Sequence, residues 1–216
     1  MKPILFNTPM TRAVDIEWKT ATRRLLKPQP AFPGYPEGIN VRPERCDDGS
    51  WCFAMDPFAM LCEGSFIQPY DEGDILYVRE AWSMAPDILR ETPGPVFRAD
   101  FTDAELQYLK EKHFRWKPSI HMPARIARIF LRVNKVRVER LQDITPDQCA
   151  AEGIEPFSGP VEARAAYYIS SFAALWDTTI QKEDLSKYGW DANPWVWVVE
   201  FERCEEPDKE ACGRDA

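Results

Sequence analysis

Two stretches of the chain alternate apolar and polar residues as β-strands do, and they limit the fold more than any other feature. Residues 125–141, RIARIFLRVNKVRVERL, place apolar side chains at odd positions from Ile129 to Val133. After Asn134 the apolar positions become even-numbered, which predicts a bulge or a tight reversal. Residues 195–203, WVWVVEFER, predict a strand with at least one buried face. Strands without regular βα alternation favour a small mixed or antiparallel β-structure.

The segment ITPDQCAAEGI has the clearest helix signals in the chain. Thr145 is the predicted N-cap, Pro146 occupies the first helical position, and Gln148 completes a capping box. Gly153 ends the helix and leaves Glu152 at its last position. An acid there opposes the helix dipole, which suggests that the carboxylate has a function, although chance also explains it.

Weaker signals predict the remaining elements. Helices are expected at 11–18, with Thr11 as the N-cap, at 103–113, and at 161–177 with an apolar stripe facing the core. A strand is expected from Ile75 to Trp82. Residues 27–70 are rich in Pro and Gly, have no sustained period, and are predicted to form a long irregular insertion.

The stretch WKTATRR, residues 18–24, concentrates one amine, two hydroxyls and two guanidinium groups. If it continues as a strand, alternation places Thr20, Thr22 and Arg24 on one face, with Arg23 on the other. These residues form an ordinary polar strand or one wall of a binding pocket, and the segment alone does not distinguish the two.

The charge of the chain is unevenly distributed. The formal net charge is −8, yet the segment 112–140 holds nine Lys or Arg residues against the single acid Glu139. This basic segment consists of Lys112, Arg115, Lys117, Arg125, Arg128, Arg132, Lys135, Arg137 and Arg140. Such a local field attracts anionic ligands, including nucleic acid, while the acidic total favours a footprint of one nucleoside or a few nucleotides.

No apolar run is long enough to span a membrane, and the first residues do not resemble a signal peptide, so a cytoplasmic protein without a membrane partner is expected. The six cysteines include no CxxC pair and are expected to be reduced thiols. A zinc site formed by Cys46, Cys52 and Cys62 with His113 or His121 is conceivable, but the spacing is unlike that of structural zinc sites.

Several motifs in order resemble the ASCH domain, a relative of the PUA RNA-binding fold. They are KTATRR, GDILYVRE, the basic strand, ITPDQCAAEGI and WVVEFE. Their sequences are similar to those of the longer ASCH proteins of bacteriophages and prophages. The resemblance implies an α+β, mainly β, PUA-like barrel with short flanking helices and two or three loop-rich insertions. It implies one domain over residues 1–203, with insertions at about 26–70, 83–118 and 155–194, followed by an acidic tail at 204–216.

The same resemblance implies action on RNA or nucleosides. Some small ASCH proteins are amidohydrolases that remove the acetyl group of N4-acetylcytidine with a lysine, a threonine and a glutamate. The pattern maps those roles onto Lys19, Thr22 and Glu152, and it makes Arg24, the motif arginine, a candidate for binding the substrate. The chain departs from the pattern where Glu17 and Trp18 replace the usual Gly-Arg.

This chemistry is consistent with the residue types. A threonine hydroxyl attacks an amide only when a base removes its proton, a role that Lys19 can fill, and Glu152 can orient the amine or pass a proton to the leaving group. No metal or other cofactor is required. The alternative for Lys19 and Glu152 is a plain salt bridge.

Four further residues are candidates for binding the substrate, a nucleoside or single-stranded RNA. Glu80 and Trp82 follow YVR and are expected to line the same cleft, with the indole stacking on a base or packing in the core. Arg128 and Arg132 are expected to contact phosphate. Two alternatives to the amidohydrolase stay open: a non-catalytic RNA-binding module and an ASCH-type ribonuclease.

Overall fold

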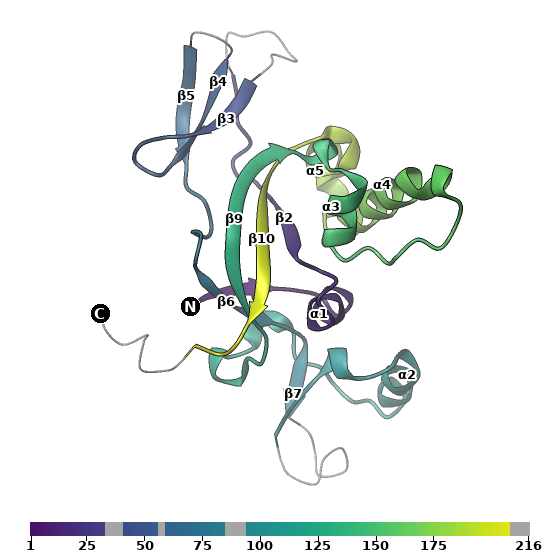
Figure 1. The fold of residues 1–216 in the computed structure, drawn as a ribbon. Helices are drawn as coiled ribbons and strands as arrows, with labels where there is room; N and C mark the ends of the chain where they lie inside the picture. Colours follow the sequence, from purple (N-terminus) through teal and green to yellow (C-terminus); the bar gives the residue numbers. More distant parts are fainter. Residues whose placement is uncertain (33–40, 56–58, 85–93, 208–216) are drawn as a thin grey trace. The chain divides into compact units, whose positions relative to one another are not determined.

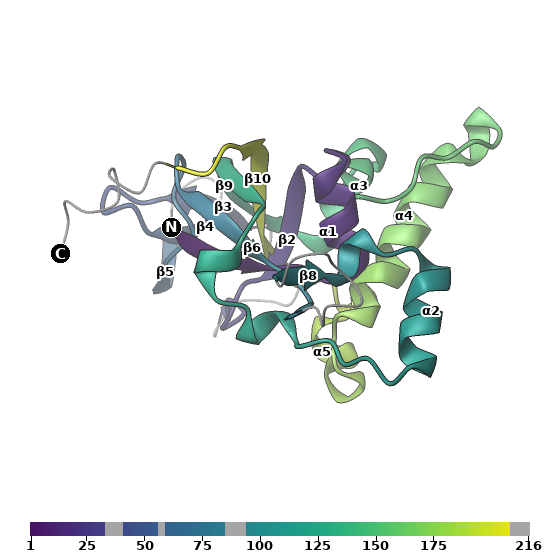
Figure 2. The same cartoon turned by 90° about the horizontal axis from the view of Figure 1, so that it is seen from below.

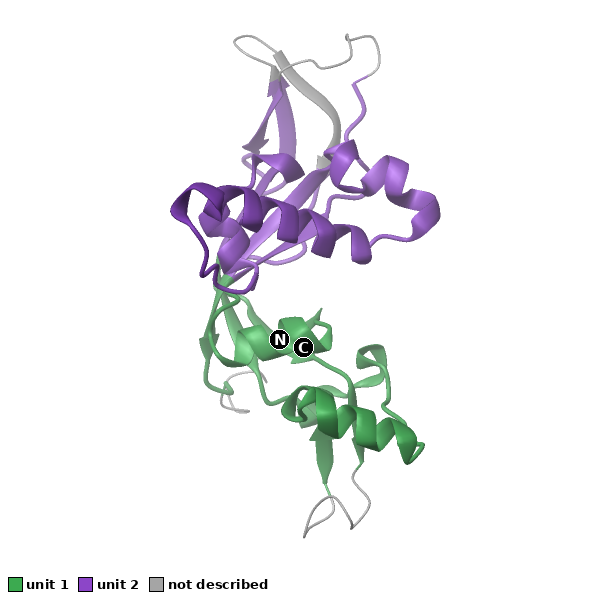
Figure 3. Ribbon diagram, turned by 90° about the vertical axis from the view of Figure 1, so that its right-hand side faces the viewer, with its two compact units in different colours: residues 1–20, 72–134, 201–216 green, residues 21–71, 135–200 purple. Residues whose placement is uncertain are grey.

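The computed structural model describes residues 1–32, 41–55, 59–84 and 94–207, and Figures 1 and 2 show the elements from two directions. The chain divides into two compact units (Figure 3). Unit 1 comprises Met1–Thr20, Glu72–Asn134 and Phe201–Ala216, and unit 2 comprises Ala21–Asp71 and Lys135–Glu200.

The largest sheet has five strands in the order β1-β6-β9-β10-β2. β1 runs parallel to β6, whereas β6 pairs antiparallel with β9, and β10 pairs antiparallel with β2. The strands are β1 (Lys2–Leu5), β2 (Ala21–Leu25), β6 (Ile75–Arg79), β9 (Phe130–Arg140) and β10 (Trp195–Cys204). The two strongest predicted strands are thus neighbours in one sheet. The fold is α+β and mostly sheet, as predicted, and the described strands form no closed barrel.

β9 shows the change of phase that the sequence predicts. Leu131 and Val133 are buried, Asn134 and Lys135 are exposed, and burial resumes at the even position Val136. The strand continues through this change, so the feature is not a reversal. The strand also begins later than predicted, because the residues before it form a short 3-10 turn (η3, Ala124–Ile126).

In unit 1, helix α1 (Thr8–Asp15) begins three residues earlier than predicted. Its N-cap is Asn7, whose Oδ1 accepts a hydrogen bond from the backbone N–H of Met10 at 2.9 Å. Thr11, the predicted cap, is buried inside the helix, and its hydroxyl donates to the Asn7 carbonyl at 3.0 Å. Asn7 is an equally good capping residue, so composition alone did not separate the two positions.

Helix α2 (Asp103–Glu111) lies where the sequence predicts it and begins with a capping box between Thr102 and Glu105. It follows a two-stranded sheet of β7 (Trp82–Met84) and β8 (Pro95–Phe97) and the 3-10 turn η1 (Arg98–Asp100). A second 3-10 turn, η2 (Ser119–His121), comes between α2 and η3. The predicted strand from Ile75 to Trp82 is therefore divided between β6 and β7.

In unit 2, the region predicted to be irregular contains a three-stranded antiparallel sheet, which corrects the expectation. Its strands are β3 (Val41–Arg45), β4 (Trp51–Met55) and β5 (Ala59–Phe66). Gly49, at a φ of 82°, lies in the turn between β3 and β4. Pairing between short strands stabilises this sheet, and the sequence period cannot reveal such pairing. Pro43 is accommodated because β3 is an edge strand.

The helices of unit 2 are α3 (Pro146–Ala151), α4 (Val161–Thr178) and α5 (Leu185–Tyr188), with 3-10 turns η4 (Leu141–Asp143), η5 (Lys182–Asp184) and η6 (Trp190–Ala192). The predicted stripe of α4 is confirmed for Tyr168, Phe172 and Trp176, which are buried with Val196 and Val198 of β10. Ala165, predicted to belong to the stripe, is exposed, and Leu175 is partly buried. None of the helices in the described ranges has the length and apolarity needed to cross a membrane.

Candidate functional site

Strand β2 carries two of the predicted site residues, Thr22 and Arg24. Alternation along the strand directs their side chains to one face and that of Arg23 to the other. Thr22 lies opposite Val199 of β10 and is 3% exposed. Burial lowers the pKa of Arg24, although the charge of Glu152 acts in the opposite direction.

Arg23 is the centre of a buried ionic cluster in unit 2. Its side chain is 1% exposed. Its Nη1 donates to Oε1 of Glu152 at 3.1 Å, and its Nε donates to Oε1 of Glu139 at 3.0 Å. Its Nη2 donates to Oε1 of Gln148 at 3.2 Å and also pairs with Glu139. Arg23 therefore holds Glu152 through a direct hydrogen bond, a role that the sequence does not indicate for it.

The position of Glu152 follows from the local signals of α3. Thr145 and Gln148 form the predicted capping box, and Gly153 adopts a φ of 92° directly after the helix. Glu152 is the C-cap residue and is 4% exposed. Gln148 has a second role, because its side-chain oxygen also accepts the hydrogen bond from Arg23. The helix cap and the ionic cluster are thus linked through one side chain.

Lys19 is a buried lysine in unit 1. It follows α1 and is 2% exposed, and its Nζ lies 5.5 Å from the ring centre of Phe6. It lines a cavity of about 300 Å³, a volume within the range of small-ligand sites. The other lining residues are Val14, Glu17, Thr20, Leu131, Phe201, Glu202 and Arg203. An amine, a hydroxyl, carboxylates and an apolar wall therefore meet in this cavity, which we call the Lys19 cavity.

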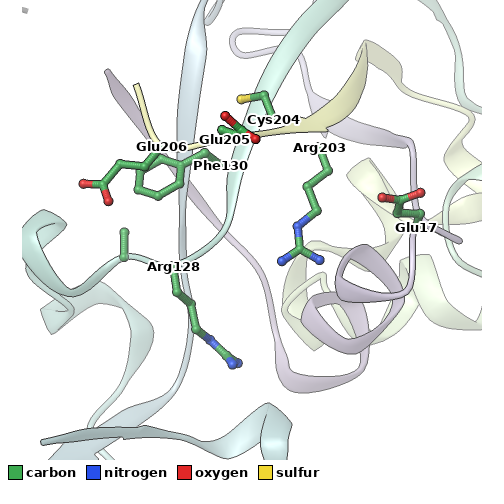
Figure 4. A pocket seen from close by; sticks show the side chains of 8 residues that line it. Glu17, Arg128, Phe130, Arg203, Cys204, Glu205 and Glu206 are labelled. Atoms are coloured by element: carbon green, nitrogen blue, oxygen red, sulfur yellow. The ribbon is translucent and has the colours of Figure 1, made fainter. Parts of the chain in front are cut away.

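A larger and more open pocket, of about 660 Å³, also lies in unit 1 (Figure 4). Glu17 and Arg203 belong to its lining as well as to that of the Lys19 cavity. Figure 4 shows Glu17 and Arg203 on one side of the pocket and Phe130 and Glu206 on the other. The remaining lining residues are Ala127, Arg128, Cys204 and Glu205. We call it the outer pocket.

Two of the predicted substrate-binding residues, Glu80 and Arg128, bind each other. Nε and Nη2 of Arg128 donate to the two carboxylate oxygens of Glu80 at 2.9 and 3.1 Å. Arg128 also forms an ion pair with Asp100 at 2.7 Å, and its guanidinium carbon lies 4.3 Å from the ring centre of Phe97. Burial raises the pKa of Glu80 despite this pairing, so desolvation outweighs the attraction of the guanidinium. Arg128 is consequently engaged within unit 1.

The other two predicted substrate-binding residues differ in exposure. Trp82 is 8% exposed, packs with Phe97 and Met122, and has Lys117 Nζ at 4.7 Å from its ring centre. These contacts are those of a core residue, and base stacking by Trp82 stays a prediction. The Arg132 side chain is 54% exposed and lies 3.9 Å from a carboxylate oxygen of Glu202. It is accessible to a phosphate group.

The structure offers no metal site among the residues it describes, since no group of three or more His, Cys, Asp or Glu side chains is arranged to hold an ion. Cys149 is buried against the ionic cluster, and burial raises the pKa of its thiol to about 11. Cys62 was one of the conceivable zinc ligands, and its side chain lies outside the described part of the chain.

The three predicted catalytic residues and Arg24, which is predicted to bind the substrate, are distributed over both units. Lys19 belongs to unit 1, whereas Thr22, Arg24 and Glu152 belong to unit 2. The convergence of these four side chains on one cleft stays a prediction. Sequence reasoning did not select Arg23, Glu139, Glu17 or Arg203.

Comparisons of the chain with protein-family models, with curated proteins and with solved structures find no match.

Proposed function

We propose that this chain is an ASCH-type protein of the kind found in phages and prophages, with a PUA-like barrel, that acts on RNA or nucleosides. In its sharpest form, the proposal is a metal-independent amidohydrolase that removes an N4-acyl group from cytidine. The observation that carries it is Lys19, an almost fully buried amine in the wall of a cavity of about 300 Å³. A lysine amine in the wall of a cavity of small-ligand size is placed to contact a bound ligand.

The proposed reaction has two steps. The Thr22 hydroxyl attacks the acyl carbon, its proton passes to Lys19, and a proton passes to N4 as the C–N bond breaks, which releases cytidine and leaves an acyl-threonine. Water then hydrolyses this ester and regenerates the hydroxyl. Glu152, held by Arg23, assists the proton transfer.

Acetate release from N4-acetylcytidine tests this proposal. We expect wild-type activity that is unchanged by EDTA, partial activity in Thr22→Ser, and loss of activity in the nearly isosteric Thr22→Val. Lys19→Met is expected to lower turnover by about 10²–10⁴, the usual contribution of a general base. Thr178→Val is the control, because it removes an exposed threonine hydroxyl on α4 that lines neither the Lys19 cavity nor the outer pocket. Wild-type protein that releases no acetate would rule out the amidohydrolase.

A non-catalytic RNA-binding module is the second candidate, and the exposed Arg132 within the basic segment favours it. In that case the wild type releases no acetate, while substitutions at Lys19 and Arg132 still weaken the binding of cytidine or single-stranded RNA.

A further inference from the structure

Helix α1 ends in a Schellman motif whose left-handed residue is Glu17. The backbone N–H of Trp18 donates to the Ala13 carbonyl at 2.8 Å, and that of Glu17 donates to the Val14 carbonyl at 3.0 Å. Glu17 has a φ of 60°. Glycine is preferred in this conformation because a Cβ atom crowds the backbone there. A glutamate at this position therefore strains the backbone locally.

Two other helices end in the same motif. After α3 the left-handed residue is Gly153, which follows the preference. After α2 it is His113, with a φ of 59° and the equivalent bonds from Phe114 to Leu109 (2.9 Å) and from His113 to Lys110 (3.0 Å). The chain thus tolerates a side chain in this conformation, and strain alone does not distinguish Glu17.

The surroundings of Glu17 distinguish it from His113. Glu17 lines both the Lys19 cavity and the outer pocket, whereas His113 lines neither. Arg203, which shares both linings, is held by Asp15 through an ion pair of 3.0 Å and a bond of 2.9 Å to the Asp15 carbonyl. Within the described part of the chain, the Glu17 carboxylate has no hydrogen-bond or ion-pair partner. It is an acceptor at the boundary of two cavities and is not engaged by the protein.

The charged residues around Glu17 indicate what kind of ligand the cavities favour. Glu202, Glu205 and Glu206 add three carboxylates to the two linings. The arginines of the linings already have acidic partners, as described above for Arg128 and Arg203. This arrangement disfavours a phosphate group and favours a neutral ligand that offers O–H or N–H donors.

We propose that Glu17 binds the ligand of the Lys19 cavity, accepting hydrogen bonds from the hydroxyl or amino groups of an unphosphorylated nucleoside. This inference rests on the proposed function, because it takes a nucleoside as the ligand. Glu17 is a specificity residue in this view, and the strained helix end is kept because glycine would lack the carboxylate.

Three variants separate binding from backbone strain. Glu17→Gly removes both the carboxylate and the strain, Glu17→Gln removes only the charged acceptor, and His113→Gly relieves the same strain away from both cavities. Cytidine binding is measured by calorimetry, and the melting temperature by circular dichroism. We expect the two glycine variants to melt about 2–4 °C higher than the wild type. We expect Glu17→Gly and Glu17→Gln to bind cytidine roughly tenfold or more weakly, with His113→Gly unchanged.

The possible outcomes test the role of Glu17 separately from the proposed action on nucleosides. Wild-type protein that binds neither cytidine nor N4-acetylcytidine would overturn both. Normal cytidine binding by both Glu17 variants would overturn only the role of Glu17. Wild-type protein that binds cytidine 5′-monophosphate more tightly than cytidine would overturn the preference for an unphosphorylated ligand.

Discussion

Arg23 illustrates how a single residue organises unit 2. A guanidinium that is 1% exposed carries a large desolvation penalty, which its bonds to Glu152, Glu139 and Gln148 offset. Its guanidinium carbon also lies 5.7 Å from the ring centre of Phe172 in α4. The cluster therefore joins β2, β9 and α3 to the core of the unit.

Replacement of Arg23 by methionine is expected to be strongly destabilising. The substitution keeps much of the side-chain volume but removes the guanidinium that binds Glu152 and Glu139 in a buried cluster, so the free energy of unfolding should fall by about 3–5 kcal/mol. Urea denaturation measures this change. Arg42→Ala is the control, since its ion pair with Glu44 is exposed and should contribute less than about 1 kcal/mol. An equally small effect for Arg23→Met would contradict the structural role of the cluster.

Among the elements, α3 connects local sequence signals with the candidate site. Its capping box and its glycine stop define a helix of six residues, and the stop places Glu152 at the C-cap. The Schellman bonds run from Gly153 to Ala150 at 2.9 Å and from Ile154 to Cys149 at 3.3 Å. A change in this terminus is therefore expected to affect both stability and the position of Glu152.

Gly153→Ala tests this element. A Cβ atom at a φ of 92° is strained, so the free energy of unfolding should fall by about 1–2 kcal/mol. Gly153→Asn is the matched variant and should lose less, because asparagine tolerates the left-handed region better than alanine. Thermal and urea denaturation measure the relative stability of the two variants. Equal stability of the alanine and asparagine variants would show that backbone conformation does not control this terminus.

At the scale of the whole molecule, the basic segment is less available than its composition suggests. Arg128 binds Glu80 and Asp100, and Arg137 binds Glu139. Arg140 donates to the Asn193 carbonyl at 3.0 Å and lies over the ring of Trp195. Arg128 and Arg137 are therefore partly neutralised by acidic side chains. If the chain binds RNA, as proposed, these two arginines should contribute little to the electrostatic part of the affinity.

Arg132 is the residue with which to test RNA binding. Arg132→Ala should weaken the binding of single-stranded RNA and reduce the slope of log K against log[salt] by about 0.7, the value for one phosphate contact. Fluorescence anisotropy over a salt titration measures both. Arg42→Ala, outside the basic segment, should leave the slope unchanged. An unchanged slope for Arg132→Ala would exclude this contact. Arg128 is unsuitable for this test, because its removal leaves the buried Glu80 unpaired.

Local signals in the sequence were sufficient for several elements. The cap and stop of α3, the position of α2, the buried stripe of α4, the strand β10 and the change of phase in β9 all follow from residues within a few positions of each other. Helix caps and side-chain periods depend on such short separations, so they can be predicted without knowledge of the fold.

Tertiary structure alone decided the rest. The sheet β3-β4-β5 depends on pairing between short strands with no period of their own. Arg23 meets Glu139 and Glu152 across 116 and 129 positions of the chain. Strand alternation separates Arg23 from Arg24, but it does not show which side chains lie on either face. Only the cavities that Glu17 lines identify it as a candidate binding residue. Ion pairing and cavity formation depend on distances in space, and these are set only when the chain has folded and excluded water from the charged groups.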